Sequence, residues 1–498
     1  MPPNLPECSD EDWASVLPGL ARPPKRPAAA FRAYEKAIRG QVKKGVIPGF
    51  CSIVIGRDQV LHVDSGGFAD VERQVPFRTD TIVRLYCMTK SIIGVAMMLL
   101  VDRGTCALED EVSKFIPAFA NLKIVSDKAQ TRAGKKDRPV RTNMTIKHLL
   151  THTSGLGYGK ELNLPPECPA EESYATLVED VEEGRVDSLE QFCERLAKLP
   201  LRREPGTAFE YSYGPDIVGR IIEVASGRSL DRFLEEELFR PLGMQDTGFS
   251  VPAAKLPRLA TLYGSSETAS FLSIEPGHEP SAAWELFPLD GPSFEARSAW
   301  AKGSHCRVFS GGGFMGHNRG GLVSTLNDLA RFFRMIANSG VLPGAQRLLS
   351  KGTVEMMVRN DWLSMRDCLG TAQVNTGLGG VTAEGAFGWN GMGELGVVAD
   401  PRQLGYAAFE LGEFGYGSLA EAFYSINPSR ELITIWITQQ VDNHSWTEKQ
   451  PKADLWAAAR RASVPAQAVV KRPASEAATN SNAPAKRRLR GKTSVATT

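Results

Sequence analysis

The sequence lacks several features that would assign a protein to a class at once. Its 498 residues carry a formal net charge of only +1, so no field of either sign draws the body of the molecule to nucleic acid or to a membrane surface. The longest apolar run, 91–101, is much shorter than the roughly 20 residues of a membrane-spanning helix. The N-terminus shows no basic stretch followed by an apolar one, so no secretory signal is visible. We therefore expect a soluble, intracellular protein of the cytoplasm.

Cysteine and histidine are present, but not in metal-binding patterns. The eight cysteines include no C-x-x-C pair, so neither a zinc site nor a disulfide framework is indicated, and we expect reduced thiols. His148 and His152 have i, i+4 spacing without a third ligand nearby in the sequence, so we expect both to be structural, with His152 hydrogen-bonded. A glycine-rich stretch at 311–316 fits G-x-G-x-x-G without the βαβ unit that binds a nucleotide. The sequence therefore predicts no metal and no cofactor.

The composition divides the chain into an arm, a body and a tail. Residues 1–29 are rich in proline, which disfavours regular structure and indicates an arm leading into the domain. Residues 30–463 form the body, because a chain of this length with 42% apolar residues can bury a large core. Residues 464–498 lack aromatic residues, so we expect a disordered tail. Its basic clusters, 471–472 and 486–490, have the spacing of a bipartite nuclear signal; a merely solubilising tail is the alternative.

Hydrophobic periodicity predicts strands at both ends of the body and helices between them. A helix over 31–44 precedes a strand pair at 50–55 and 59–64, and a second strand pair lies at 420–427 and 431–439. Helical patterns dominate the middle, at 146–150, 189–197, 216–226, 230–238 and 324–338. We therefore predict an α+β fold. An α/β sandwich lobe takes its antiparallel sheet from the N- and C-terminal segments, and a mainly helical lobe is inserted at about 105–340.

A cysteine lies at the start of the most apolar helix. The extended segment 81–86 runs directly into a helix predicted over 87–102, which places Cys87 at the junction, and Lys90 lies one helical turn later on the same face. The helix dipole and the neighbouring ammonium group both favour the thiolate form, which a nucleophilic cysteine requires. A C-x-x-K match also arises by chance among this many cysteines and lysines, so the motif alone is a weak signal.

The surroundings of this motif resemble a known family. The segment R-L-Y-C-M-T-K-S-I-I-G at 84–94 is similar to the S-x-x-K segment of β-lactamase-related esterases and transesterases, with Cys87 where the family carries serine. These enzymes form a class C-like branch of the serine β-lactamase and penicillin-binding-protein superfamily. Downstream, L-L-T-H-T-S-G-L at 149–156 matches the family's L-L-x-H-T-S-G-L signature, and P-G-T-A-F-E-Y-S-Y at 205–213 resembles its P-G-x-x-F-x-Y-S segment. The resemblance covers roughly residues 31–460.

The resemblance implies roles for particular residues. Cys87 would attack an acyl carbonyl, while Lys90 and Tyr211 share the general-base and general-acid work. Tyr213 stands where the family usually has an asparagine, at a position bordering the substrate.

The third motif of the family, K-T-G in the penicillin-recognising enzymes, corresponds here to Tyr416, Gly417 and Ser418. The resemblance implies that the backbone N–H groups of Cys87 and Ser418 form the oxyanion hole, and that Tyr416 and Gly417 border the substrate. A glycine in this strand would let a substrate approach its edge closely. Because the motif has no lysine, the carboxylate of a β-lactam loses its usual anchor, and we expect no β-lactam turnover.

The resemblance therefore predicts a hydrolase or transacylase that acts on small esters or amides through a covalent acyl-enzyme on Cys87. One alternative is a pseudoenzyme that keeps the cleft to bind an acyl ligand or a partner. Another is a scaffold that is targeted through its basic tail. The expected partner is a small-molecule acyl substrate, with no nucleic acid and no membrane bound by the main domain.

Overall fold

The computed structural model describes most of the body of the chain. The described residues are 13–23, 29–125, 137–157, 170–207, 210, 212–265, 286–289, 321–358, 414–418, 420–441 and 451–463. The tail, 464–498, lies outside them, so its disorder and its role in targeting stay predictions.

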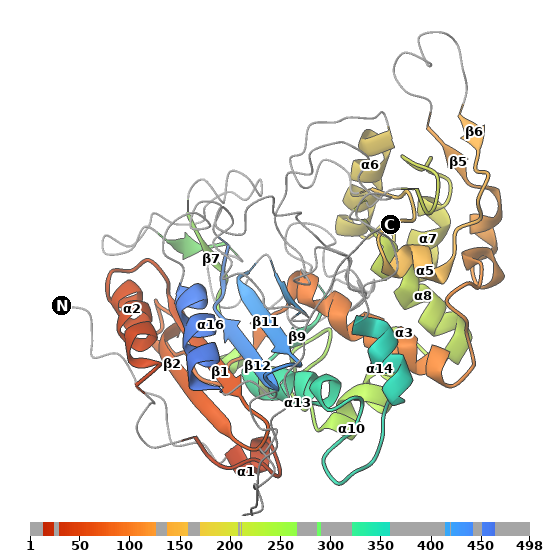
Figure 1. Ribbon diagram of the computed structural model, residues 1–498. Coiled ribbons are helices and arrows are strands. Elements are labelled where there is room, and N and C mark those ends of the chain that lie inside the picture. The colour runs from red at the N-terminus through yellow and green to blue at the C-terminus, as the bar shows by residue number, and fades with distance from the viewer. Residues whose placement is uncertain are drawn as a thin grey trace, which may run out of the picture.

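A six-stranded antiparallel sheet forms the centre of the molecule (Figure 1). In spatial order its strands are β10 (Phe414–Gly417), β11 (Ala422–Asn427), β12 (Leu432–Ile437), β1 (Gly49–Ile55), β2 (Val60–Asp70) and β3 (Val75–Pro76). β1 pairs with β12, from Cys51 opposite Ile437 to Ile55 opposite Ile433. The sheet therefore joins the two ends of the body, as the sequence predicts, and both predicted strand pairs are confirmed.

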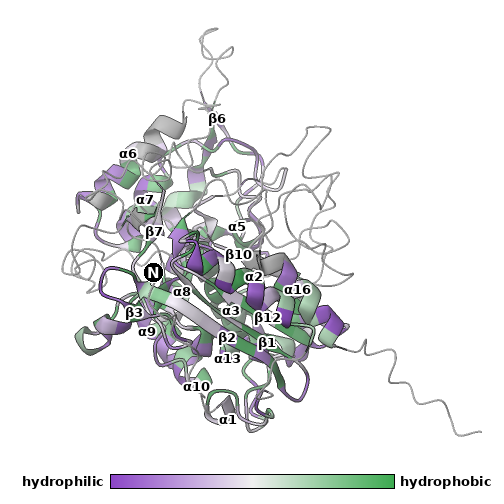
Figure 2. Cartoon of the chain, turned by 90° about the vertical axis from the view of Figure 1, so that its left-hand side faces the viewer, coloured by the Kyte–Doolittle hydropathy of each residue, from purple (hydrophilic) through white to green (hydrophobic). Residues whose placement is uncertain are grey.

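Apolar side chains alternate between the two faces of the sheet, and both faces are buried. On one face, Phe50 and Val54 of β1 and Trp436 of β12 pack with α2 and α16. On the other face, Ile53 of β1 and Ile435 of β12 lie in the main core with α3 and α13. The covering helices are α2 (Arg32–Lys43), α16 (Pro451–Ala462), α3 (Thr89–Asp102) and α13 (Leu326–Ala337). In Figure 2, β1, β12 and α3 are mainly hydrophobic, whereas α2 and α16 carry hydrophilic residues as well.

A helical lobe packs on the far side of α3. Its helices are α5 (Ile146–Leu150), α6 (Ala170–Glu182), α7 (Leu189–Leu196), α8 (Gly214–Ser226) and α9 (Leu230–Leu234). α8 packs against α3, α5, α7 and α9, so α3 lies between the sheet and the lobe. Almost every residue of α3 is buried, as expected of a helix that is apolar all round.

Shorter elements complete the described structure. The helical ones are η1 (Tyr86–Met88), η2 (Val112–Lys114), η3 (Pro117–Asn121), η5 (Glu235–Phe239), α10 (Arg240–Leu242), η6 (Ala253–Arg258) and α14 (Lys351–Val358). The strands are β4 (Val83–Arg84), β5 (Lys123–Ile124), β6 (Arg138–Pro139), β7 (Tyr263–Gly264), β8 (Phe287–Pro288), β9 (Val323–Ser324) and β13 (Gln440–Val441). Among the helices that the structure describes, none combines the length and apolar character needed to cross a bilayer.

Two boundaries differ from the sequence-based expectation. Within the arm predicted at 1–29, α1 (Trp13–Val16) forms, and its Trp13 joins the main core together with Leu17 and Leu20. These apolar side chains outweigh the prolines around them. The helix predicted at 324–338, inside the inserted lobe, packs as α13 against β1 and β12, so the chain has already returned to the sheet there.

Replacing Ile435 by alanine should lower the free energy of unfolding by about 2–5 kcal/mol, because a fully buried side chain in β12 is lost and a cavity remains. Val224→Ala is the control, since Val224 on α8 is 40% exposed and its loss should change stability by at most about 0.5 kcal/mol. Urea unfolding followed by circular dichroism measures both. Equal effects would contradict the assignment of this face of the sheet to the core.

Candidate active site

The candidate nucleophile lies where a short strand turns into a helix. β4 ends at Arg84, the 3-10 turn η1 carries Cys87, and α3 begins at Thr89. Tyr86, directly before the thiol, has a φ of +44°, a left-handed conformation that costs energy for a residue with a side chain. Cys87 is not in a disulfide, and it is 8% exposed. The structure therefore has this cysteine where the sequence predicts it, at the start of a buried helix.

Hydrogen bonds from two distant segments hold this turn. The Leu85 N–H donates to the Leu322 carbonyl oxygen at 2.9 Å, and the Leu322 N–H donates to Thr89 Oγ1 at 3.0 Å. From the other side, Gln439 Oε1 accepts the Arg84 N–H at 2.9 Å, while Gln439 Nε2 donates to the Arg84 carbonyl oxygen at 3.2 Å. The side-chain amide of Gln439 thus makes the two hydrogen bonds to the Arg84 backbone that a neighbouring strand would otherwise make. The local sequence pattern does not predict this role of Gln439, because Gln439 and Arg84 are far apart in the sequence and meet only in the folded protein.

Lys90 is fully buried one turn after Cys87, on α3. Its positive charge acts on His152, whose pKa is lowered well below the usual value by burial and, next, by Lys90. His152 is itself buried, and its Nδ1 accepts the Ser212 N–H at 3.3 Å, which confirms the predicted hydrogen-bonding role. The Glu210 N–H donates to the His152 carbonyl oxygen at 2.7 Å.

Tyr211, the predicted catalytic tyrosine, lies outside the described residues. Its two chain neighbours, Glu210 and Ser212, both bond to His152. The signature at 149–156 and the segment around Tyr211 therefore meet at a histidine that is within electrostatic reach of Lys90.

The third motif lies at the end of β10, the outermost strand of the sheet as far as the chain is described, and β10 contacts η1, the turn that carries Cys87. The Ser418 N–H donates to the Ala422 carbonyl oxygen at 2.9 Å, and the Ala422 N–H donates to Ser418 Oγ at 3.2 Å. The Ser418 N–H is thus already used in the turn between β10 and β11. Its predicted role as an oxyanion donor stays a prediction, and it requires this bond to open.

The glycine of this motif has a different physical reason from the one the sequence suggests. A Cβ atom on Gly417 would collide with the ring of Phe423 on the neighbouring strand β11. The position therefore needs glycine for packing within the sheet, whatever substrate approaches it. The backbone of Tyr416 pairs with Tyr424 of β11; its side chain is outside the described part, so its substrate contact stays a prediction.

Tyr213 lies at the start of α8 and is fully buried. Its ring packs edge-on against Phe192 at 5.5 Å between centroids and lies 6.4 Å from the ring of Tyr174. These contacts belong to the core of the helical lobe. They explain why an aromatic residue stands at this position, and a role for Tyr213 beside the substrate stays a prediction.

The other described cysteines differ from Cys87 in their surroundings. Cys51, Cys106 and Cys193 are buried and are not in disulfides. Burial is the main cause that raises the pKa of Cys106 to about 11 and the pKa of Cys193 well above its usual value. These two thiols are therefore held neutral in the fold.

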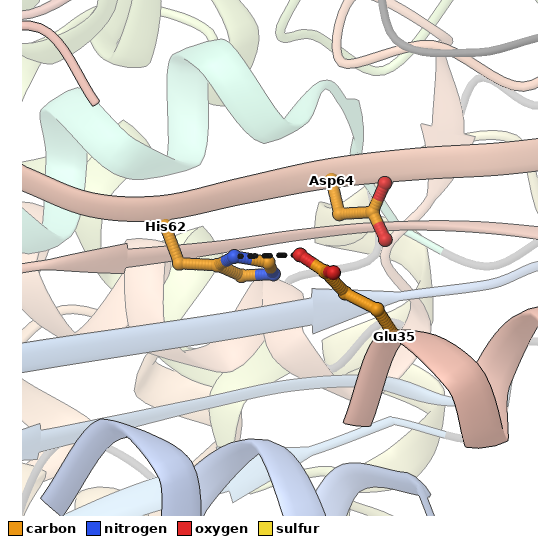
Figure 3. Close-up of side chains that lie close together, drawn as sticks. All are labelled: Glu35, His62 and Asp64. Atoms are coloured by element: carbon orange, nitrogen blue, oxygen red, sulfur yellow. Dashed lines mark ion pairs between the residues drawn. The ribbon is translucent and has the colours of Figure 1, made fainter. Parts of the chain in front are cut away.

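One cluster of side chains in the described part of the chain has the composition of a metal site (Figure 3). Glu35 of α2 and His62 and Asp64 of β2 each place one ligand atom within 4.8 Å of the others. Arg39, however, forms an ion pair with Asp64, and the ring of His62 stacks on Phe31 at 4.4 Å. The guanidinium group already supplies the positive charge that a metal ion would bring, so we assign this cluster a structural role.

Acidification should test the burial of His62. Burial, and secondarily Arg39, lower its pKa to about 3, so between pH 6.5 and 3 the unfolded chain binds a proton that the folded protein does not. This residue alone should cost about 2 kcal/mol of stability between pH 7 and pH 5. In His62→Gln that loss should vanish from urea unfolding curves recorded at the two pH values. The same pH dependence in both proteins would contradict the assignment.

The chain belongs to the Beta-lactamase family, whose model matches residues 34–455. An uncharacterized protein of Mycobacterium tuberculosis is 30% identical over 413 residues, which are 81% of this chain and 89% of that protein. Esterase EstB of Burkholderia gladioli is 30% identical over 319 residues, 64% of this chain and 73% of that one. Monacolin J acid methylbutanoyltransferase of Aspergillus terreus is 29% identical over 227 residues, 44% of this chain and 51% of the enzyme.

Solved structures share the fold. Simvastatin synthase (LovD) from Aspergillus terreus superimposes with a TM-score of 0.61 at 21% identity, covering 87% of this chain and 98% of that one. EstCE1, a hydrolase with promiscuous acyltransferase activity, gives 0.60 at 22% identity, covering 87% and 100%. A penicillin-binding-protein homolog from Caulobacter crescentus gives 0.57 at 19%, covering 87% and 98%. The predicted β-lactamase and penicillin-binding-protein-like fold is confirmed.

Proposed function

We propose that the protein is an acyl-transfer enzyme that cleaves small esters or amides through a covalent acyl-enzyme on Cys87. The observation that carries this proposal is the thiol of Cys87 on η1, directly before α3, followed three residues later by the fully buried Lys90. A thiol beside a lysine side chain is the pairing that nucleophilic cysteines use, because a neighbouring base can take up the thiol proton. The relatives named as an esterase and as a methylbutanoyltransferase support acyl chemistry of this kind.

In the first half of the proposed reaction, the thiol proton of Cys87 passes to the amine nitrogen of Lys90 or to the phenolate oxygen of Tyr211, and the sulfur bonds to the acyl carbon. The carbon–oxygen or carbon–nitrogen bond of the substrate then breaks. The leaving alcohol or amine takes up the proton from the same group, and a thioester remains on the enzyme.

In the second half, water or a second alcohol attacks the thioester carbon. The acid or the new ester leaves, and the proton returns to Cys87 through the same residues. The motif at Tyr416, Gly417 and Ser418 offers no lysine to a substrate carboxylate, so we propose neutral esters or amides rather than β-lactams as substrates.

Cys87→Ala should abolish covalent labelling by p-nitrophenyl butyrate, measured as added acyl mass on the intact protein and as nitrophenolate release. Cys106→Ala is the matched control, because it removes another buried thiol, whose pKa burial raises to about 11, and it should leave labelling unchanged. Cys87→Ser should retain or raise ester hydrolysis, since the family's own nucleophile is restored.

Each outcome of this experiment is informative. An adduct that persists in Cys87→Ala would refute the nucleophile. An adduct that forms without turnover would indicate that an alcohol or amine is the natural acceptor. An unlabelled parent chain would count against acyl transfer and favour a pseudoenzyme that only binds an acyl ligand.

Lys90→Ala should slow labelling of Cys87 about tenfold or more at pH 7, and far less above pH 9, where the thiol ionises without help. Lys147→Ala is the control, because Lys147 on α5 pairs with Glu109 at the surface, away from η1. The measurement is the labelling rate between pH 6 and 10. A profile unchanged from that of the parent would exclude the proposed pairing.

A further inference from the structure

A groove lies where α1, α10 and α13 come together, at the lower end of the molecule in Figure 1. Its volume is about 720 Å³, within the range of small-molecule sites. Residues 15–19, the turn at 240–243, the C-terminal half of α13 and the turn at 341–345 form its walls. None of the residues discussed around Cys87 lines it, so the groove is separate from the candidate active site.

The walls carry positive charge without any acidic residue. Arg240, Arg331 and Arg334 line the groove, and no aspartate or glutamate does. Arg331 is 3.1 Å from Asp328, which partly neutralises it. Arg240 contacts Glu235 only at 3.7 Å and with both side chains exposed, a pair that contributes little. An anion in the groove would therefore be attracted chiefly by Arg334, whose charge no ion pair neutralises among the described residues.

Arg334 is the central group of this surface. Its Nη1 donates to the Pro18 carbonyl oxygen at 2.6 Å, which fixes the guanidinium group between α13 and the residues after α1. Among the described residues it makes no ion pair with an acidic side chain, and burial lowers its pKa because no anion compensates the lost water. A guanidinium group held in this way suits a carboxylate, which accepts two parallel N–H bonds.

The remaining wall is largely apolar. Val16 of α1 is half-buried there, and the floor is formed by side chains that are at most 5% exposed: Leu17, Leu242, Met335 and Leu342. A hydrocarbon chain lying along these side chains gains about 25 cal/mol for each Å² removed from water. The groove thus combines one anion-binding group with an apolar track.

We propose that this groove binds an amphipathic carboxylate, such as the anion of a medium-chain fatty acid, with its carboxylate on Arg334 and its chain along the apolar wall. This binding is independent of the acyl chemistry at Cys87. The anionic head and the hydrocarbon chain are both required, so the neutral amide of the same chain length should bind weakly.

The test is isothermal titration of the full chain with octanoate and with octanamide. Octanoate should bind at least about tenfold more tightly than octanamide, and Arg334→Met should weaken octanoate binding about tenfold while leaving octanamide unchanged. Arg232→Met is the matched control, because Arg232 lies on α9, outside the groove, in an exposed pair with Glu236. It should bind octanoate like the parent.

Two further measurements separate binding in the groove from binding near Cys87 and from loss of folding. Octanoate can also enter the acyl cleft, so the titrations are repeated in Cys87→Ala, where the dependence on Arg334 should persist. If Arg334→Met fails to fold, Arg334→Lys replaces it; this variant keeps the charge but loses the two-pronged geometry, and should weaken octanoate binding several-fold. Equal affinity for octanoate and octanamide, or octanoate binding that is unaffected by either Arg334 substitution, would overturn the proposal.

Discussion

The antiparallel pairing of β1 with β12 is the contact on which the rest of the structure depends. It brings the two ends of the body into one sheet and gives the covering helices two apolar faces to pack on. Directly after β12, the Thr438 hydroxyl donates to the Gly49 carbonyl oxygen, and the next side chain, Gln439, reaches the backbone of Arg84. The same pairing that closes the sheet therefore also positions the strand that leads to Cys87.

The candidate active site is consequently built from segments that are far apart in the sequence. The turn around Cys87 is fixed by Leu322 and Gln439, and Lys90 and the residues beside Tyr211 meet around His152. Preorganisation of this kind is what a nucleophile and its proton carriers require, because a displacement of about 1 Å already costs catalytic rate.

Local patterns predict much of this structure. The apolar run of α3 and the strand pairs near both ends are confirmed, because burial on one or both faces leaves a periodic signature in the sequence. The helix predicted at 146–150 is confirmed with the same bounds. Thr145 and His148 form a capping box that defines its start. The family resemblance adds which sheet edge lies beside the thiol.

The remaining features depend on contacts between different elements of the fold, which local patterns do not predict. The use of the Ser418 N–H by Ala422 and the packing of Tyr213 on Phe192 follow from tertiary neighbours, which no spacing rule reveals. The helix α6 is missed although its buried apolar residues have the i, i+3, i+4, i+7 spacing of a helix: Tyr174, Leu177, Val178 and Val181. The contacts of Ser418 and Tyr213 are harder to predict than the helices and strands, because their partners belong to other elements of the fold.

The order of strands in the sheet also has a consequence for biosynthesis. During translation, β1 and β2 are complete long before β12 leaves the ribosome, so β1 waits with an open edge, and α16 is not yet present on one face. Folding of the body is therefore largely post-translational, and premature termination before β12 would release a chain with an aggregation-prone edge.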